Sequence, residues 1–142
     1  MKRIIKYLIK VFFGAAAGFA VWMLMSVSID RLLDFVMPAW FIAERAAIDR
    51  ALDTTSDPFS PTVLFLSVSL LINAVAVIAA GYISVVLSKK RIVPPYLVGS
   101  SIAILIFVLS FHTPLALPWW YRILAAGTVI PMALLGAKLS KR

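Results

Sequence analysis

The chain contains four apolar stretches that are long enough to cross a bilayer and carry no acidic residue: 11–29, 61–88, 95–112 and 118–137. A helix of about 20 apolar residues spans the roughly 30 Å hydrocarbon core of a membrane. Backbone exposed to lipid must satisfy its own hydrogen bonds, and the sequence lacks the alternating pattern of a transmembrane β-barrel. The sequence therefore predicts an all-α integral membrane bundle of four transmembrane helices, folded as a single membrane domain over residues 1–142.

The composition excludes most classes of soluble protein. Residues of the AVILMFWYC set make up 63% of the 142 residues, against about 45–50% in typical soluble domains. A domain of this size has too little interior to hide so much apolar surface, and its mean hydropathy is +1.01. A soluble enzyme, a nucleic-acid-binding domain and a disordered tail are therefore excluded. The chain has no Cys, so disulfides, thiolate metal sites and a Cys nucleophile are absent.

Residues that start helices set the boundaries of the spans. Ser60 is expected to cap the second span, with Pro61 in the first helical position, where a missing N–H costs nothing. The first span follows Lys2 and Arg3 and so also resembles a secretory signal peptide. Its apolar run continues through Leu24, beyond the usual apolar core of about 7–15 residues. We therefore expect this segment to be retained as a membrane span.

Lys and Arg are distributed unevenly between the two sides of this four-span arrangement. Ten lie on one side: Lys2, Arg3, Lys6, Lys10, Lys89, Lys90, Arg91, Lys138, Lys141 and Arg142. The other side has four, together with all six carboxylates: Arg31, Arg45, Arg50, Arg122, Asp30, Asp34, Glu44, Asp49, Asp53 and Asp57. Short loops rich in Lys and Arg stay in the cytoplasm. We therefore expect both termini to be cytoplasmic (N-in/C-in), in the cytoplasmic (inner) membrane of a bacterium.

Interfacial side chains agree with this orientation. Trp40, Trp119, Trp120 and Arg122 are expected to anchor the chain at the outer interface between membrane and water. The basic inner ends also attract anionic lipid headgroups, by about 1 kcal/mol per residue near the surface. Membrane lipid is therefore an expected partner. Nucleic acid is not, because no folded basic surface lies outside the membrane.

Residues 30–60 form the one sizeable segment outside the four spans. Pro38 is expected to end a helical continuation of the first span, and turn-forming residues fill 54–58. Between them an amphipathic helix is predicted from Trp40 to Asp53. Its apolar face consists of Trp40, Phe41, Ala47, Ile48, Ala51 and Leu52. Its opposite, polar face consists of Arg45, Asp49, Arg50 and Asp53. This helix is either a lid or docking surface, or a connector whose Arg and Asp residues pair locally.

Small and polar residues inside the spans indicate where helices pack. Asn73 lies near the middle of the second span, where an unpaired amide is costly, so it should face another helix. It belongs to a helical stripe of small and polar residues, whereas the first and third spans have glycine faces suited to close approach. The residues expected to pack are Gly14, Gly18, Asn73, Ala76, Ala80 and Gly99.

Pro131 lies inside the fourth span. It deprives the Gly127 carbonyl of its helical donor and is expected to kink the helix. Thr128 is placed where its hydroxyl can compensate part of the freed backbone.

The chain offers little chemistry for catalysis or cofactor binding. Ionisable residues inside a membrane mark proton and ion pathways, and the spans contain none away from their ends. A lone His112 cannot build a bis-histidine haem or a Glu-x-x-His site, and Asp30 with Asp34 supplies too few oxygens for Ca²⁺. No nucleophile–base pair is evident. We therefore predict a non-enzymatic protein with no catalytic residues, no cofactor and no metal.

The second half carries a loose set of motifs. Gly81-Tyr82 is followed by the basic loop Lys89-Lys90-Arg91, and Pro118-Trp119 begins a span that contains a Pro131-x-x-x-x-Gly136 pattern. Over roughly residues 70–142 the chain resembles small uncharacterised bacterial four-span integral membrane proteins. The resemblance implies a four-span membrane fold and carries no activity, so it assigns no functional residue.

Two functions are compatible with these features. The first is an assembly or accessory subunit that packs through its Gly/Ala faces, either as a homo-oligomer or within a larger membrane complex. The alternative is a small transporter or channel with a polar pathway near Ser69, Asn73 and Ser100. The first depends on where the small residues face, and the second depends on whether these polar side chains converge.

Overall fold

The computed structural model describes residues 2–53, 59–113 and 115–140. Within them the chain is helical and contains no strand, with the elements α1 (Lys2–Val36), α2 (Ala39–Asp53), α3 (Val63–Ser88), α4 (Val93–His112), α5 (Trp119–Gly127) and α6 (Val129–Leu139). Four segments are long and apolar enough to cross a membrane, when α5 and α6 are taken together. This confirms the all-helical fold with four membrane-length helices. The turn predicted at 54–58, Lys141 and Arg142 lie outside the described residues.

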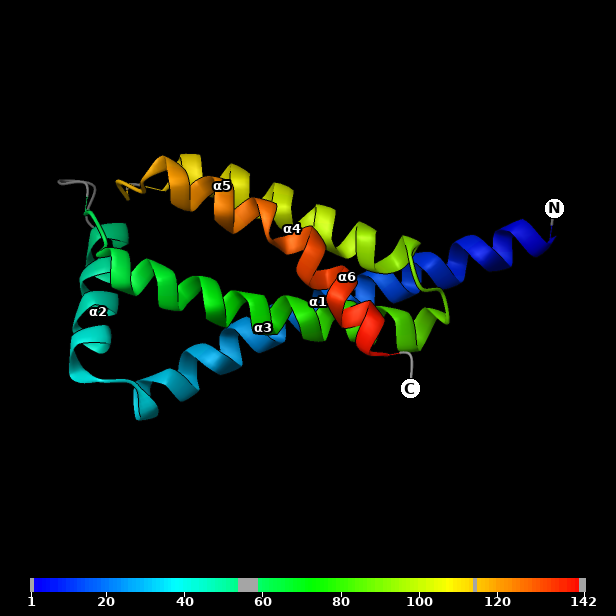
Figure 1. The fold of residues 1–142 in the computed structure, drawn as a ribbon, viewed down its shortest axis with the longest axis horizontal. Helices are drawn as coiled ribbons and strands as arrows, with labels where there is room; N and C mark the ends of the chain where they lie inside the picture. Colours follow the sequence, from blue (N-terminus) through cyan, green and yellow to red (C-terminus); the bar gives the residue numbers. More distant parts are fainter. Residues whose placement is uncertain (1, 54–58, 114, 141–142) are drawn as a thin grey trace.

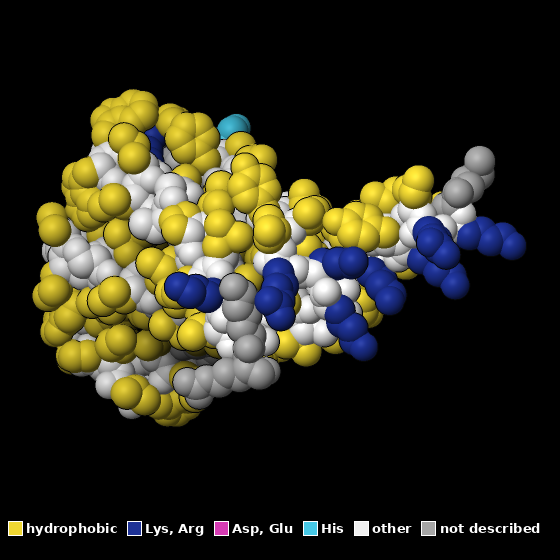
Figure 2. Space-filling view, turned by 45° about the vertical axis from the view of Figure 1, so that its right-hand side comes forward, with side chains coloured by type: hydrophobic (Ala, Val, Ile, Leu, Met, Phe, Trp, Pro, Cys, Tyr) yellow, Lys and Arg dark blue, Asp and Glu magenta, His cyan; other side chains and the backbone are white. Residues whose placement is uncertain are grey.

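The long helices form a bundle with two different ends (Figure 1). The short helix α2 lies across one end, which we call the α2 end. The other end contains the start of α1, the α3–α4 turn and the end of α6, and its cations are Lys2, Arg3, Lys6, Lys10, Lys89, Lys90, Arg91 and Lys138. We call it the basic end. Figure 2 shows Lys and Arg side chains gathered there, with no Asp or Glu visible on the face in view.

Three helix starts differ from the sequence prediction. The helix α4 begins at Val93, before residue 95, because a proline costs no hydrogen bond in the first turn of a helix. α1 is helical from Lys2, well before residue 11, because the preceding residues contain neither Pro nor Gly to stop it. α3 begins at Val63, and Thr62 caps it in place of Ser60 by accepting a hydrogen bond from the Phe65 N–H. The extended backbone at Thr62 puts Pro61 before the helix, so the proline does not occupy the first helical position.

The fourth membrane-length segment is interrupted at Thr128, where α5 ends and α6 begins. The interruption falls three residues before Pro131, which lacks the N–H that a continuous helix would direct to Gly127. The Thr128 hydroxyl donates a hydrogen bond to the Leu124 carbonyl at 2.7 Å. In Figure 1, α6 turns away from the direction of α5 after this point.

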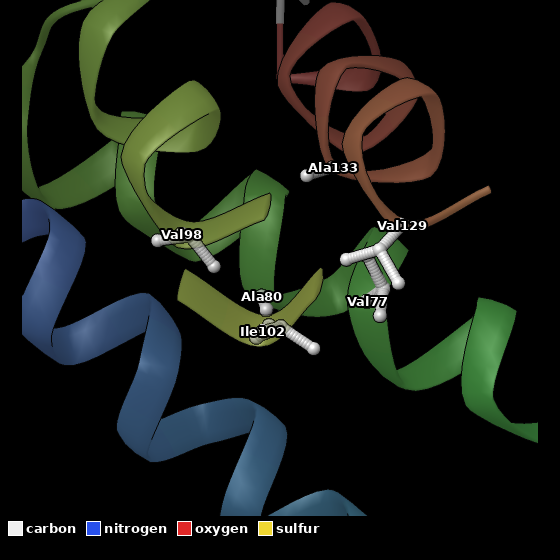
Figure 3. Close-up of a cluster of buried hydrophobic side chains, with 6 residues drawn as sticks. All are labelled: Val77, Ala80, Val98, Ile102, Val129 and Ala133. Atoms are coloured by element: carbon white, nitrogen blue, oxygen red, sulfur yellow. The ribbon is translucent and has the colours of Figure 1, made fainter. Parts of the chain in front are cut away.

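A compact core joins α3, α4 and α6 (Figure 3). It consists of Val77, Ala80, Val98, Ile102, Val129 and Ala133, each at most 1% exposed. A second cluster lies at the α2 end, where the ring of Phe41 stacks on Phe65 with centroids 4.6 Å apart and so fixes α2 to α3. By contrast, large apolar side chains such as Phe12, Leu71 and Ile104 are exposed on the outside of the bundle. An exposed apolar surface of this extent fits a lipid environment.

Candidate functional site

A recess opens at the α2 end between α1, α2, α3 and the segment that leads into α5. Its volume is about 370 Å³, within the range of about 300–1,000 Å³ found for small-molecule sites. Its wall combines apolar and aromatic side chains with hydrogen-bonding groups of α1 and α3, among them Phe41, Phe65, Leu66, Ile72, Ser26, Ser69 and Asn73. The recess therefore reaches from the bundle end to the level of Asn73.

The deepest polar group in the recess is Asn73. It lies ten residues into α3, which places it about 15 Å along the helix. The Trp22 indole N–H donates a hydrogen bond to its Oδ1 at 3.0 Å. The amide nitrogen of Asn73 has no hydrogen-bond acceptor among the described residues. Because an isolated amide N–H is costly away from water, this donor is available to a bound molecule or to water in the recess.

Two serines lie one turn nearer the mouth. Ser26 follows Trp22 by four residues on α1, and Ser69 precedes Asn73 by four residues on the antiparallel α3, so both are on the same faces as the Trp22–Asn73 pair. Within the described part of the chain neither hydroxyl makes a hydrogen bond. The third residue of the predicted pathway, Ser100, is half-buried on α4 and is not among the described residues that line the recess. The structure thus brings together Ser69 and Asn73 but not Ser100.

Polar contacts of α2 border the mouth of the recess. Arg45 donates a hydrogen bond to the Asp30 carbonyl at 2.7 Å and lies 3.5 Å and 3.4 Å from the carboxylates of Asp30 and Asp34. The carboxylate of Glu44 accepts hydrogen bonds from the Thr62 N–H and hydroxyl. Arg45 was predicted on the polar face of this helix, and it reaches Asp30 and Asp34 on α1 because α2 crosses the bundle end and meets a helix on each flank. These contacts hold α2 between α1 and α3.

The small residues expected to pack are used within the chain. A Cβ added at Gly14 would lie 2.5 Å from the Ser88 Cβ, and one at Gly18 would lie 2.8 Å from the Ala80 carbonyl oxygen. One at Gly99 would lie 3.0 Å from the Ile130 Cα. Ala76 and Ala80 are buried on α3. These positions bring α1, α3, α4 and α6 close together, so their faces are already occupied by helices of the same chain.

The interface anchors lie at the same end of the bundle as the recess. Trp119 is largely exposed, whereas Trp40 and Trp120 are each about two-fifths exposed. Arg122 packs against the rings of Phe111 and Trp119 at 4.8 Å and 5.5 Å and donates a hydrogen bond to the Leu117 carbonyl. This arrangement gives α5 an aromatic rim around a single cation.

The charged residues of the recess are Asp30 on α1 and Arg45 and Asp49 on α2. Within the described ranges no three of His, Asp and Glu come close enough to hold a metal. His112 lies at the end of α4, where its Nδ1 is 2.8 Å from the Val108 carbonyl. The other polar groups of the recess are the hydroxyls of Ser26, Ser69 and Tyr121 and the amide of Asn73, so the recess can bind a molecule through hydrogen bonds and charge. The arrangement suits recognition of a small molecule.

Several residues of the structure were not singled out in the sequence. Trp22 and Ser26 were overlooked because their spacing of four residues resembles any helical face. Gly81 and Gly136 meet the backbone of Ala133 and Ile78 and bring α3 and α6 together. The motifs of the second half contain both glycines, so a signal existed, but nothing in the motifs shows which backbone each glycine meets.

The described residues form an all-helical bundle with four helices long and apolar enough for a multi-pass membrane protein, and with a cavity of mixed apolar and polar lining that opens at one end. No protein-family model, curated protein or solved structure matches this chain.

Proposed function

We propose that the protein lies in the cytoplasmic membrane of a bacterium with the basic end inside and the α2 end outside. The charge distribution supports this orientation, because the described carboxylates lie on α2 or on the adjoining part of α1, and the basic end has only cations. Loops rich in Lys and Arg remain cytoplasmic. On this orientation α2 is an interfacial helix with Phe41 and Ala51 buried against the bundle, and the recess opens to the outside.

Within this orientation, the function we propose is the binding and passage of a small solute, as a non-enzymatic transporter or channel component. The recess carries the proposal, because it brings open hydrogen-bonding groups of Ser26, Ser69 and Asn73 to mid-span depth beside aromatic walls. Buried polar groups in membrane proteins face partners or water-filled cavities. The close helix contacts at Gly14 and Gly18 lie on the basic side of the recess, so access from the inside requires α1 to move relative to α3.

Cysteine labelling tests this proposal cleanly, since the chain has no Cys of its own. Ser69→Cys is expected to react with a membrane-impermeant, cationic methanethiosulfonate added outside. Ser67→Cys is the matched control, because Ser67 is two residues away, exposed on the bundle surface and bonded to the Val63 carbonyl. The thiolate is the reactive species and forms in water, so residue 69 should react about tenfold faster or more.

Passage of a solute requires that residue 69 can also be reached from the cytoplasmic side. Ser69→Cys must also react, more slowly, when the reagent is added to inverted vesicles, whose cytoplasmic face points outward. Asn73→Leu in the Ser69→Cys background should slow the reaction from the inside, because residue 73 lies between residue 69 and the basic end, and should change the reaction from the outside little. Equal rates at residues 67 and 69 would contradict the aqueous recess, and reaction from the outside alone would contradict passage.

Assembly with a second copy is the other candidate function, and an exposed groove between α1 and α4 favours it. The groove is lined by Phe12, Ala15, Ala16, Phe19, Leu97, Val98 and Ser101. Ala16 and Ala20 are both exposed on α1 and lie four residues apart, the spacing that allows helices to approach closely in membranes. Unlike the glycine faces, the outer part of this groove, at Phe12 and Ala16, is exposed in the described structure.

A disulfide test addresses assembly directly. Ala16→Cys is expected to form a disulfide-linked dimer in oxidised native membranes, because a bridge requires Cα atoms within about 7 Å. Leu71→Cys, which is 70% exposed on α3, provides the control. A monomer on non-reducing gels for both variants would contradict assembly through this groove.

A further inference from the structure

The first turns of α1 differ from the rest of the helix. Residues 2–10 are all exposed, and their cations are Lys2, Arg3, Lys6 and Lys10. Lys2 and Lys6 lie on the same helix face as Ile9 and Phe13, since positions i, i+4, i+7 and i+11 share a face. A shallow apolar groove follows directly on the exposed surface of α1 itself, lined by Leu8, Ile9, Phe12, Phe13 and Ala16. A pair of cations therefore stands above an apolar groove on one side of α1.

The position of this segment matches the depth of lipid headgroups. The Lys90 ammonium lies 4.8 Å from the ring centroid of Tyr7, so Tyr7 is level with the α3–α4 turn. A turn that joins two membrane spans lies at the membrane surface, so Lys2 lies about 8 Å beyond it. The polar region of a bilayer leaflet is about 5–8 Å thick. Lys2 and Lys6 are thus at headgroup depth, whereas the groove lies at the depth of the acyl chains.

No anion of the described chain neutralises these cations. The nearest described carboxylate on α1 is Asp30, which lies about 36 Å along the helix from Lys6. Charges in water are screened over about 8–10 Å. The other described acidic residues belong to the α2 end. Among the described residues, therefore, no carboxylate competes with an anionic headgroup for Lys2 and Lys6.

We propose that Lys2, Lys6 and the adjoining groove form a binding site for an anionic phospholipid. The phosphate binds between the two ammonium groups, and one acyl chain lies along Ile9, Phe12 and Phe13. This site is separate from the proposed solute recess, which lies at the opposite end of the bundle. Assignment to the inner leaflet rests on the proposed orientation, whereas binding itself does not.

Native mass spectrometry of the full chain in mild detergent tests the site. Phosphatidylglycerol and phosphatidylcholine with identical acyl chains are supplied at equal concentration. Each basic residue near a membrane surface favours anionic lipid by about fivefold, so phosphatidylglycerol should be preferred about tenfold or more by the wild-type chain. Lys2→Gln combined with Lys6→Gln is expected to bring the two lipids to equal occupancy.

Two control experiments distinguish binding at this site from general attraction between basic residues and anionic lipid. Lys89→Gln combined with Arg91→Gln removes the same charge from the same end, away from the groove, and should preserve the preference. Excess inorganic phosphate should leave the bound lipid in place, because the groove holds its chain. Equal occupancy in the wild type, equal loss in both double variants, or displacement by phosphate would overturn the proposal. These readouts are independent of labelling at residue 69, so the two proposals can fail separately.

Discussion

Gly81→Ala is expected to lower the free energy of unfolding by about 2–3 kcal/mol, the upper part of the range for overpacking. A Cβ at this position would meet the backbone of Ala133, and backbone cannot rotate away as a side chain can. Gly136 makes the reciprocal contact with the Ile78 carbonyl. Relief of either clash requires α3 and α6 to separate, which loses the dispersion contacts that hold helices together in lipid.

Reversible unfolding in mixed micelles of mild detergent and dodecyl sulfate measures this effect. Gly127→Ala is the matched control, since a Cβ there has no neighbour within 4 Å, and it should change stability by less than about 0.5 kcal/mol. Gly81→Ala and Gly136→Ala in one chain should be sub-additive by about 1 kcal/mol, because one helix separation relieves both clashes. Full additivity would show that the two glycines do not share a contact.

Ile102→Ala is expected to have an effect of similar size, about 2–4 kcal/mol, by leaving a cavity in the core. Ile102 is 0% exposed and lies among side chains of α3, α4 and α6 (Figure 3). Ile104, two residues further along α4, is 64% exposed. Lipid can refill the space left by Ile104→Ala, so this control should cost less than about 0.5 kcal/mol.

The same unfolding assay compares the two variants. A loss at Ile104 as large as that at Ile102 would mean that the outer face of α4 is covered by protein. That result would place a partner on the face next to the α1–α4 groove and favour assembly. Near-neutral effects at both positions would contradict the packed core of Figure 3.

The two halves of the bundle differ in how closely their helices approach one another. Close backbone contacts at Gly14, Gly18, Gly81 and Gly136 hold the helices together toward the basic end. Toward the α2 end, larger side chains such as Trp22, Phe41 and Phe65 separate the helices. The recess lies in this half, with Phe41 and Phe65 in its wall. A solute that reaches Asn73 from outside would meet the tightly packed half next, so passage depends on rearrangement of that half.

The sequence shows which small and polar residues must contact another helix, but it does not show which residues they contact. Asn73 was identified as an amide that needs a partner, and the Trp22 indole supplies it from 51 residues away. Glu44 interrupts the apolar pattern of α2, and the structure accounts for this, because Glu44 binds Thr62 at the start of α3. Neither pairing could be deduced from spacing along one helix, since each joins two helices.

By itself, the sequence determined the four membrane-length helices and the grouping of the described carboxylates at one end of the bundle. Both follow from the solvent, because the thickness and polarity of a bilayer act on each segment independently of its neighbours. Tertiary structure alone decided that Gly14 and Gly18 face α3, that Gly81 meets Ala133, and that Ser69 enters a recess without Ser100. Lipid makes every apolar helix face equally acceptable, so steric fit and a few hydrogen bonds between distant residues select the partners.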